Sequence, residues 1–126
     1  MKKILIVEDH ADTRKLIRMT LELEDFEIFE AATGDEGLAL TSKARPDIVL
    51  LDVAMPSAHN NLEVCRRIKQ APLLQHTRVV RLPPCGSGGG AEDVAQARRH
   101  GADDALPTPF STQRILDSIR QLEARA

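Results

Sequence analysis

The chain has 126 residues and a nearly balanced charge, because 17 basic and 19 acidic side chains give a net charge of −2. This length fits one domain over residues 1–126, and the charge balance argues against a dedicated nucleic-acid-binding or membrane-surface module. No apolar run approaches the ~20 residues of a membrane span, so we expect no membrane partner. Cys65 and Cys85 have no metal-ligand spacing, which favours a reduced, cytoplasmic protein.

The first third of the chain alternates strand-like and helix-like patterns. Residues 3–7 form a short, nearly continuous apolar run, which is typical of a strand buried on both faces. Residues 14–23 predict a helix. Its apolar residues near one stripe are Leu16, Ile17, Leu21 and Leu23. Residues 26–31 alternate apolar and polar side chains and predict a half-buried strand, and Thr33 then begins a helix as the N-cap of a capping box with Glu36.

The pattern continues after Pro46 with residues 47–52, the most apolar run in the chain and the best candidate for a central strand. The later elements are predicted at 61–70 (helix), 78–82 (strand), 91–100 (helix), 103–107 (strand) and 111–124 (helix). The apolar residues expected on the buried faces of the first and last of these helices are Val64, Cys65, Ile68, Ile115, Leu116, Ile119 and Leu122. Five strands alternating with five helices predict a parallel sheet covered on both faces.

Acidic residues follow two of these strands directly. Glu8 and Asp9 come after residues 3–7, and Asp52 ends the strand at 47–52. If the strand order is 2-1-3-4-5, these two strands are neighbours ~4.8 Å apart, and ligands of such sheets bind beyond the carboxyl ends of the strands. The three carboxylates then need a cation, and oxygen ligands suit Mg²⁺. A carboxylate beside Mg²⁺ can act as a nucleophile toward a phosphoryl group.

The chain resembles the receiver domains of two-component response regulators over essentially its whole length. The segments that carry the resemblance, in family order, are ILIVEDH, PDIVLLDVAMP, LEVCRRIK, GADDAL and PF. The resemblance implies a flavodoxin-like α/β fold, with a five-stranded parallel sheet of order 2-1-3-4-5 and five helices on its two faces. It also implies that Asp52 accepts a phosphoryl group, and that Glu8, Asp9, Asp52 and the backbone carbonyl of Ala54 hold Mg²⁺.

The same resemblance implies the partners. The phosphoryl donor would be a histidine kinase or a phosphotransfer protein. An output partner would bind the face formed by residues 91–100, 103–107 and 111–124, and this face also forms homodimers in many relatives. The role would be signal transduction by protein contact rather than enzymatic turnover. Any catalysis would be limited to self-phosphorylation from a donor and self-dephosphorylation.

Three positions depart from the family pattern. Pro83 stands where family members usually carry Ser or Thr, and proline has neither a hydroxyl nor an N–H to donate. Thr108 replaces the lysine that usually precedes the proline at Pro109, and Ala105 replaces an aromatic residue. The residues for metal binding are therefore present and those for readout are missing, which predicts an atypical receiver with weakened switching.

Two residues are candidate substitutes for the missing lysine. Thr108 offers a neutral hydroxyl donor, but a charge-assisted hydrogen bond is roughly twice as strong. Arg81 lies two residues before Pro83 and so points to the same side of its strand. We hypothesise that Arg81 supplies positive charge to the carboxylates, with the alternative that its guanidinium extends to water at the sheet edge. His10 lies beside the acids, where a solvated turn is favoured over contact with the metal site.

Residues 86–91 match the spacing G-x-G-x-x-A of a dinucleotide phosphate loop. That loop belongs after the first strand of its unit, whereas this one follows the fourth. A flexible loop that uncouples Asp52 from helix 91–100 is the favoured interpretation. Two alternatives to a phosphorylated receiver stay open. One is a phosphorylation-independent interaction module, and the more distant one is a flavodoxin-like nucleotide or flavin binder, which the lack of Trp and Tyr disfavours.

Overall fold

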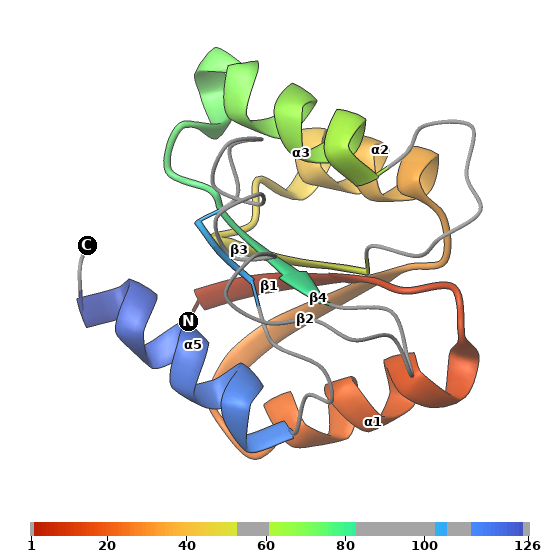
Figure 1. Cartoon of the computed structure of the whole chain (residues 1–126), viewed down its shortest axis with the longest axis vertical. Coiled ribbons are helices and arrows are strands. Elements are labelled where there is room, and N and C mark those ends of the chain that lie inside the picture. The colour runs from red at the N-terminus through yellow and green to blue at the C-terminus, as the bar shows by residue number, and fades with distance from the viewer. Residues whose placement is uncertain (1, 53–60, 83–102, 106–111, 125–126) are drawn as a thin grey trace.

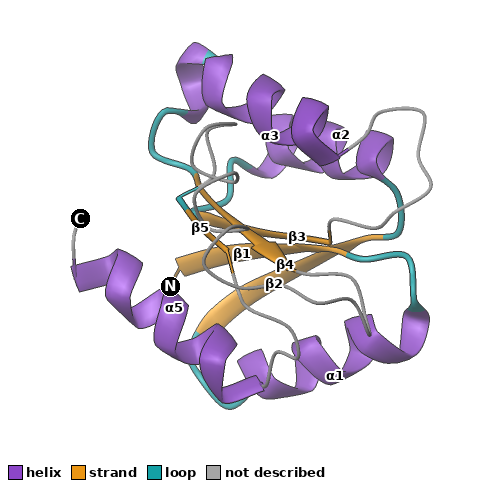
Figure 2. Ribbon diagram, in the orientation of Figure 1, coloured by secondary structure: helices purple, strands orange, loops and turns teal. Residues whose placement is uncertain are grey.

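The computed structural model describes residues 2–52, 61–82, 103–105 and 112–124. Its strands form one five-stranded parallel sheet in the order β2-β1-β3-β4-β5, which confirms the flavodoxin-like order (Figure 2). The strands are β1 (Lys2–Val7), β2 (Phe26–Ala31), β3 (Ile48–Asp52), β4 (Arg78–Leu82) and β5 (Asp104–Ala105). The helices are α1 (Ala11–Leu21), α2 (Gly34–Ala44), α3 (Asn61–Gln70) and α5 (Thr112–Ala124), with a 3-10 turn at Pro72–Leu74 that was not expected. The helix predicted at 91–100 lies outside the described residues.

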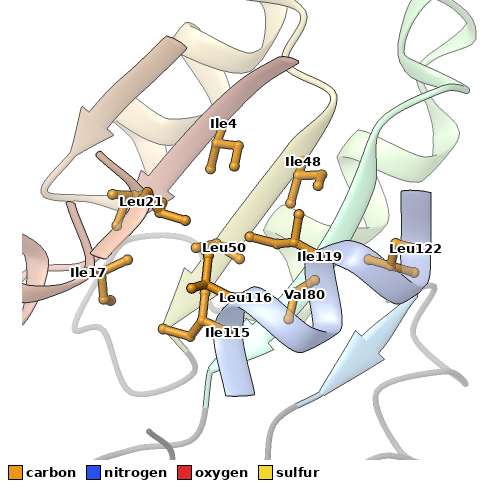
Figure 3. Close-up of a cluster of buried hydrophobic side chains, with 11 residues drawn as sticks. Ile4, Ile17, Leu21, Ile48, Leu50, Val80, Ile115, Leu116, Ile119 and Leu122 are labelled. Carbon is orange, nitrogen blue, oxygen red and sulfur yellow. The ribbon is translucent and has the colours of Figure 1, made fainter. Parts of the chain in front are cut away.

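Helices α2 and α3 cover one face of the sheet, and α1 and α5 cover the other (Figure 1). The central strands β1 and β3 are apolar at consecutive positions because each buries side chains on both faces. Leu5, Val7, Val49 and Leu51 pack on the side of α2 and α3. Ile4, Ile6, Ile48 and Leu50 pack on the side of α1 and α5, as Figure 3 shows for three of them. Two cores therefore hold the sheet between its helices.

The apolar faces predicted for α3 and α5 are confirmed, since every residue named for them is buried. The prediction for α1 is half wrong. Ile17 and Leu21 are buried, but Leu16 and Leu23 are exposed. Residue 16 is turned ~100° from residue 17 around the helix, and α1 ends at Leu21, so neither exposed leucine reaches the sheet.

The half-buried pattern of β2 and the N-cap role of Thr33 are confirmed. The half-buried pattern of β2 fits its place at the edge of the sheet. The hydroxyl of Thr33 accepts a hydrogen bond of 3.1 Å from the Glu36 backbone N–H, as an N-cap should. This cap sets where α2 begins, and with it how α2 meets the end of β1.

Gly37 lets α2 approach β1 closely. A Cβ atom at this position would lie 2.9 Å from Cγ2 of Val7. Helix propensity alone favours alanine over glycine, but overpacking costs more, so we expect Gly37→Ala to lower the free energy of unfolding by about 1 kcal/mol. Urea unfolding measures this, with Ser42→Ala on the exposed side of α2 as the control. A stabilised Gly37→Ala protein would contradict the close packing.

Candidate metal centre

The acidic residues predicted as ligands lie at one edge of the sheet. Strands β1 and β3 are parallel neighbours with Val7 opposite Leu51, so Glu8 and Asp52 come at the same level. The carboxyl ends of both strands lie side by side on the right in Figure 1. The Glu8 backbone N–H still donates to the carbonyl of Ala31 at 3.0 Å, which holds Glu8 to the sheet. The fold thus places both carboxylates at the end of its two central strands.

Four side chains converge at this edge. Glu8, Asp9, His10 and Asp52 each offer one ligand atom, and these atoms lie within 4.8 Å of one another. Glu8 and Asp52 are each only 4% exposed, and their side chains share a hydrogen bond. Oδ1 of Asp9 is buried and has no hydrogen-bond partner within the described part of the chain. The cluster therefore concentrates negative charge, and His10 Nδ1 lies 3.1 Å from this Asp9 oxygen without a hydrogen bond to it.

This crowding changes the protonation of Glu8. Burial, the hydrogen bond with Asp52 and the charges of Asp52 and Asp9 raise the pKa of Glu8 from 4.5 to about 8. Each of these causes disfavours the ionised carboxylate. A cation between the carboxylates would act in the opposite direction and favour ionised Glu8. The three carboxylates therefore disfavour one another's ionised forms, and a bound cation would relieve this repulsion.

The donor set fits Mg²⁺. Three carboxylates supply the hard oxygen ligands that Mg²⁺ prefers. Oδ1 of Asp9 is buried and accepts no hydrogen bond from the described residues, so a cation would satisfy it. Glu8, Asp9 and Asp52 would hold the ion. The predicted fourth ligand, the carbonyl of Ala54, lies outside the described residues.

Two arginines of α1 bind Glu30 of β2, and one of them also binds the backbone of Glu8. Arg14 donates from Nη1 to the backbone carbonyl of Glu8 at 2.8 Å and from Nε to Oε1 of Glu30 at 3.2 Å. Arg18 donates from Nη1 to the other oxygen of Glu30 at 2.6 Å. Sequence reasoning missed Arg14, because only the pairing of β1 with β2 brings Glu30 and the Glu8 carbonyl within reach of one side chain. The hydrogen bond from Arg14 to the Glu8 carbonyl fixes the backbone between Glu8 and Asp9.

Comparison with known families decides the identity of the fold. The family model of the response regulator receiver domain matches residues 4–120. The chain belongs to this family. Phosphorylation and dependence on Mg²⁺ are general properties of receiver domains, which are phosphoacceptors in two-component systems rather than turnover enzymes.

Several curated relatives of this receiver domain are named transcriptional regulators. The protein ResD of Bacillus subtilis is 36% identical over 98% of this chain, and PhoB of Rhizobium meliloti is 30% identical over all of it. The match covers 49% of ResD and 54% of PhoB, so the chain spans about half the length of these relatives.

Solved receiver structures share the fold. The chemotaxis protein CheY4 of Vibrio cholerae has a TM-score of 0.83 at 28% identity, covering 97% of this chain and 98% of that one. A receiver domain from Clostridium thermocellum has a TM-score of 0.84 at 26% identity, covering 99% of this chain and 96% of that one. None of the helices in the described ranges is both long and apolar enough to span a membrane.

The structure describes the surroundings of Arg81 on β4. Arg81 lies opposite Leu51 and two residues after Val79, and both of these apolar residues belong to the core under α2 and α3. The positive charge of Arg81 acts on the buried thiol of Cys65, and the Nε of Arg81 is buried without a hydrogen-bond partner in the described ranges. The hypothesis that Arg81 supplies positive charge to the carboxylates stays a prediction.

The other departures from the family pattern are not placed by the structure. Pro83 and Thr108 lie outside the described residues, as does the glycine-rich segment at 86–91. Ala105 is described only as a backbone position of β5, paired with Arg81. The predictions made for these positions stay predictions.

Proposed function

We propose that residues 1–126 form a single atypical receiver domain in which Asp52 accepts a phosphoryl group with Mg²⁺ held by Glu8, Asp9, Asp52 and the carbonyl of Ala54. One observation carries the proposal. The Asp52 carboxylate, at the end of a central strand, lies within 4.8 Å of the Glu8 and Asp9 ligand atoms. This arrangement pairs a nucleophile with the two acids that would hold its metal.

The transfer is a displacement at phosphorus. An oxygen of Asp52 forms a bond to phosphorus as the P–N bond of a phosphohistidine breaks, and the donor imidazole leaves with the bonding pair. Bound Mg²⁺ supplies positive charge to the phosphoryl oxygens. The hydrogen bond from Arg14 to the Glu8 carbonyl fixes the backbone that positions the Glu8 and Asp9 carboxylates. Hydrolysis of the acyl phosphate by water returns Asp52 to its carboxylate.

The weak point of this receiver is its response to phosphorylation. Pro83 has no donor for the new phosphoryl group, and Thr108 offers a neutral hydroxyl in place of an ammonium. We therefore propose that the phosphorylated state gains fewer contacts than in typical family members. Asp52 would still react, but the coupling to the rest of the domain would be weakened.

The same departures favour a second function. A constitutive module would bind its partner whether or not Asp52 is phosphorylated, and Pro83, Ala105 and Thr108 are what such a module would tolerate. Reactivity of Asp52 distinguishes the two functions.

The proposed donor is a histidine kinase or a phosphotransfer protein. The proposed output surface includes β5 and α5 together with the helix predicted at 91–100, and it is also where a homodimer would form. ResD and PhoB are named transcriptional regulatory proteins, so a transcriptional output of the whole protein is the corresponding proposal. We propose no direct nucleic-acid contact for this domain.

Intact-mass analysis after incubation with acetyl phosphate and Mg²⁺ tests the phosphoacceptor. We expect one added phosphoryl group on the wild-type protein and none on Asp52→Asn, because Asp52 is the proposed acceptor and Glu8 and Asp9 are the proposed metal ligands. Chelation of Mg²⁺ should abolish the modification. Asp25→Asn, an exposed aspartate far along the chain from the cluster, should be modified like the wild type.

Two results would change the proposal. An unmodified wild-type protein that still binds Mg²⁺ would support the constitutive module instead. A reaction of Arg81→Met that is slower than that of the wild type would support Arg81 as a source of positive charge, whereas an unchanged reaction would refute that role.

A further inference from the structure

His10 faces the acidic cluster rather than capping its own helix. It is the N-cap residue of α1, but its side chain makes no capping hydrogen bond. Instead, Nδ1 lies 3.2 Å from Oε1 of Glu8 and 3.1 Å from Oδ1 of Asp9. The ring thus brings a nitrogen donor to the position where two of the carboxylates meet.

A single hydrogen bond or ion pair of His10 does not account for both of its carboxylate contacts. One ring nitrogen carries at most one hydrogen, and the hydrogen bond that Nδ1 makes is with Glu8. Oδ1 of Asp9 stays buried without a hydrogen-bond partner in the described part of the chain, although Nδ1 is near it. Donor atoms ~2.0–2.2 Å from a shared ion lie ~3 Å from each other. The observed separations therefore suit ligands around one cation.

We infer that His10 Nδ1 is an additional ligand of this centre and that it favours divalent transition ions such as Co²⁺ and Zn²⁺. Imidazole nitrogen suits these ions, whereas Mg²⁺ is bound through oxygen. The His10 side chain is 69% exposed, so an ion can reach it from solvent. The inference rests on the same carboxylates as the proposed function, and it adds a choice of metal that three carboxylates alone would not make.

Metal titration of His10 variants tests the inference. We would measure Co²⁺ binding by visible absorption and Mg²⁺ binding by competition, for the wild type, His10→Ala and His10→Asn. Loss of an outer partner of a metal ligand already costs 10–100-fold in affinity, so loss of the ligand itself should weaken Co²⁺ binding at least about tenfold. Mg²⁺ affinity should change by less than about threefold. The Co²⁺ spectrum should also change, because a nitrogen ligand is lost.

His76→Ala is the matched control. His76 is exposed and lies beside Arg45, whose carbonyl is 3.3 Å from its ring Nε2, so its loss should leave both affinities unchanged. Equal losses of Co²⁺ and Mg²⁺ affinity in the His10 variants, or no loss in either, would overturn the inference. The titration uses no phosphoryl donor. An unreactive Asp52 would therefore refute the proposed function without refuting the metal preference.

Discussion

Glu8→Gln is expected to stabilise the metal-free protein by on the order of 2 kcal/mol at pH 8 and by much less at pH 5. The pKa of Glu8 is raised to about 8 in the folded state, from 4.5 in the absence of the fold. The folded protein therefore binds the Glu8 proton more tightly than the unfolded chain does. The stability that depends on this proton is complete below pH 4.5 and is lost as the pH rises toward 8. Glutamine keeps the neutral form at every pH.

Urea unfolding in the presence of a chelator measures this effect at the two pH values. Glu27→Gln removes an exposed glutamate from the edge strand β2 and is the matched control, with no gain expected at either pH. Added Mg²⁺ should stabilise the wild type more than Glu8→Gln, because ligand binding to the folded state adds to its stability. If the gain in unfolding free energy from Glu8→Gln does not grow between pH 5 and pH 8, the fold does not raise the pKa of Glu8.

Leu50→Ala is expected to lower the free energy of unfolding by about 3 kcal/mol, within the range of buried leucine truncations. Leu50 lies on the central strand β3, is 0% exposed and packs in the core under α1 and α5 (Figure 3). Truncation of this side chain leaves a cavity, because the closely packed isoleucines around it have little freedom to shift into the empty space. Because whole domains are stable by only about 5–15 kcal/mol, the loss is a large share of the total.

Urea unfolding at constant pH and Mg²⁺ concentration tests the core. Leu73→Ala is the control, because Leu73 is an exposed leucine of the 3-10 turn, and we expect it to change stability by less than about 0.5 kcal/mol. Equal effects of the two substitutions would mean that the sheet does not depend on this core. Leu50 is also two residues before Asp52, so the same strand supports both the core and the reactive carboxylate.

The sequence by itself determined the architecture and the position of the acidic cluster. Strand and helix periodicities are local properties, and the bounds 26–31, 61–70 and 78–82 were predicted as the structure has them. Parallel strands align their carboxyl ends, so Glu8 and Asp52 were expected to meet once the strand order was assumed. The N-cap at Thr33 could be predicted from the four residues from Thr33 to Glu36 alone.

Only the tertiary structure decided which groups face each other across elements. The apolar stripe of α1 was predicted too wide. The way α1 packs on the sheet decides which of its apolar residues are buried, and Leu16 lies in solvent. The register of β3 against β4 pairs Arg81 with Leu51, which the sequence alone does not show. The same holds for Arg14, which reaches Glu30 on the neighbouring strand β2. Such contacts depend on register and side-chain direction, and neither is a local property of the chain.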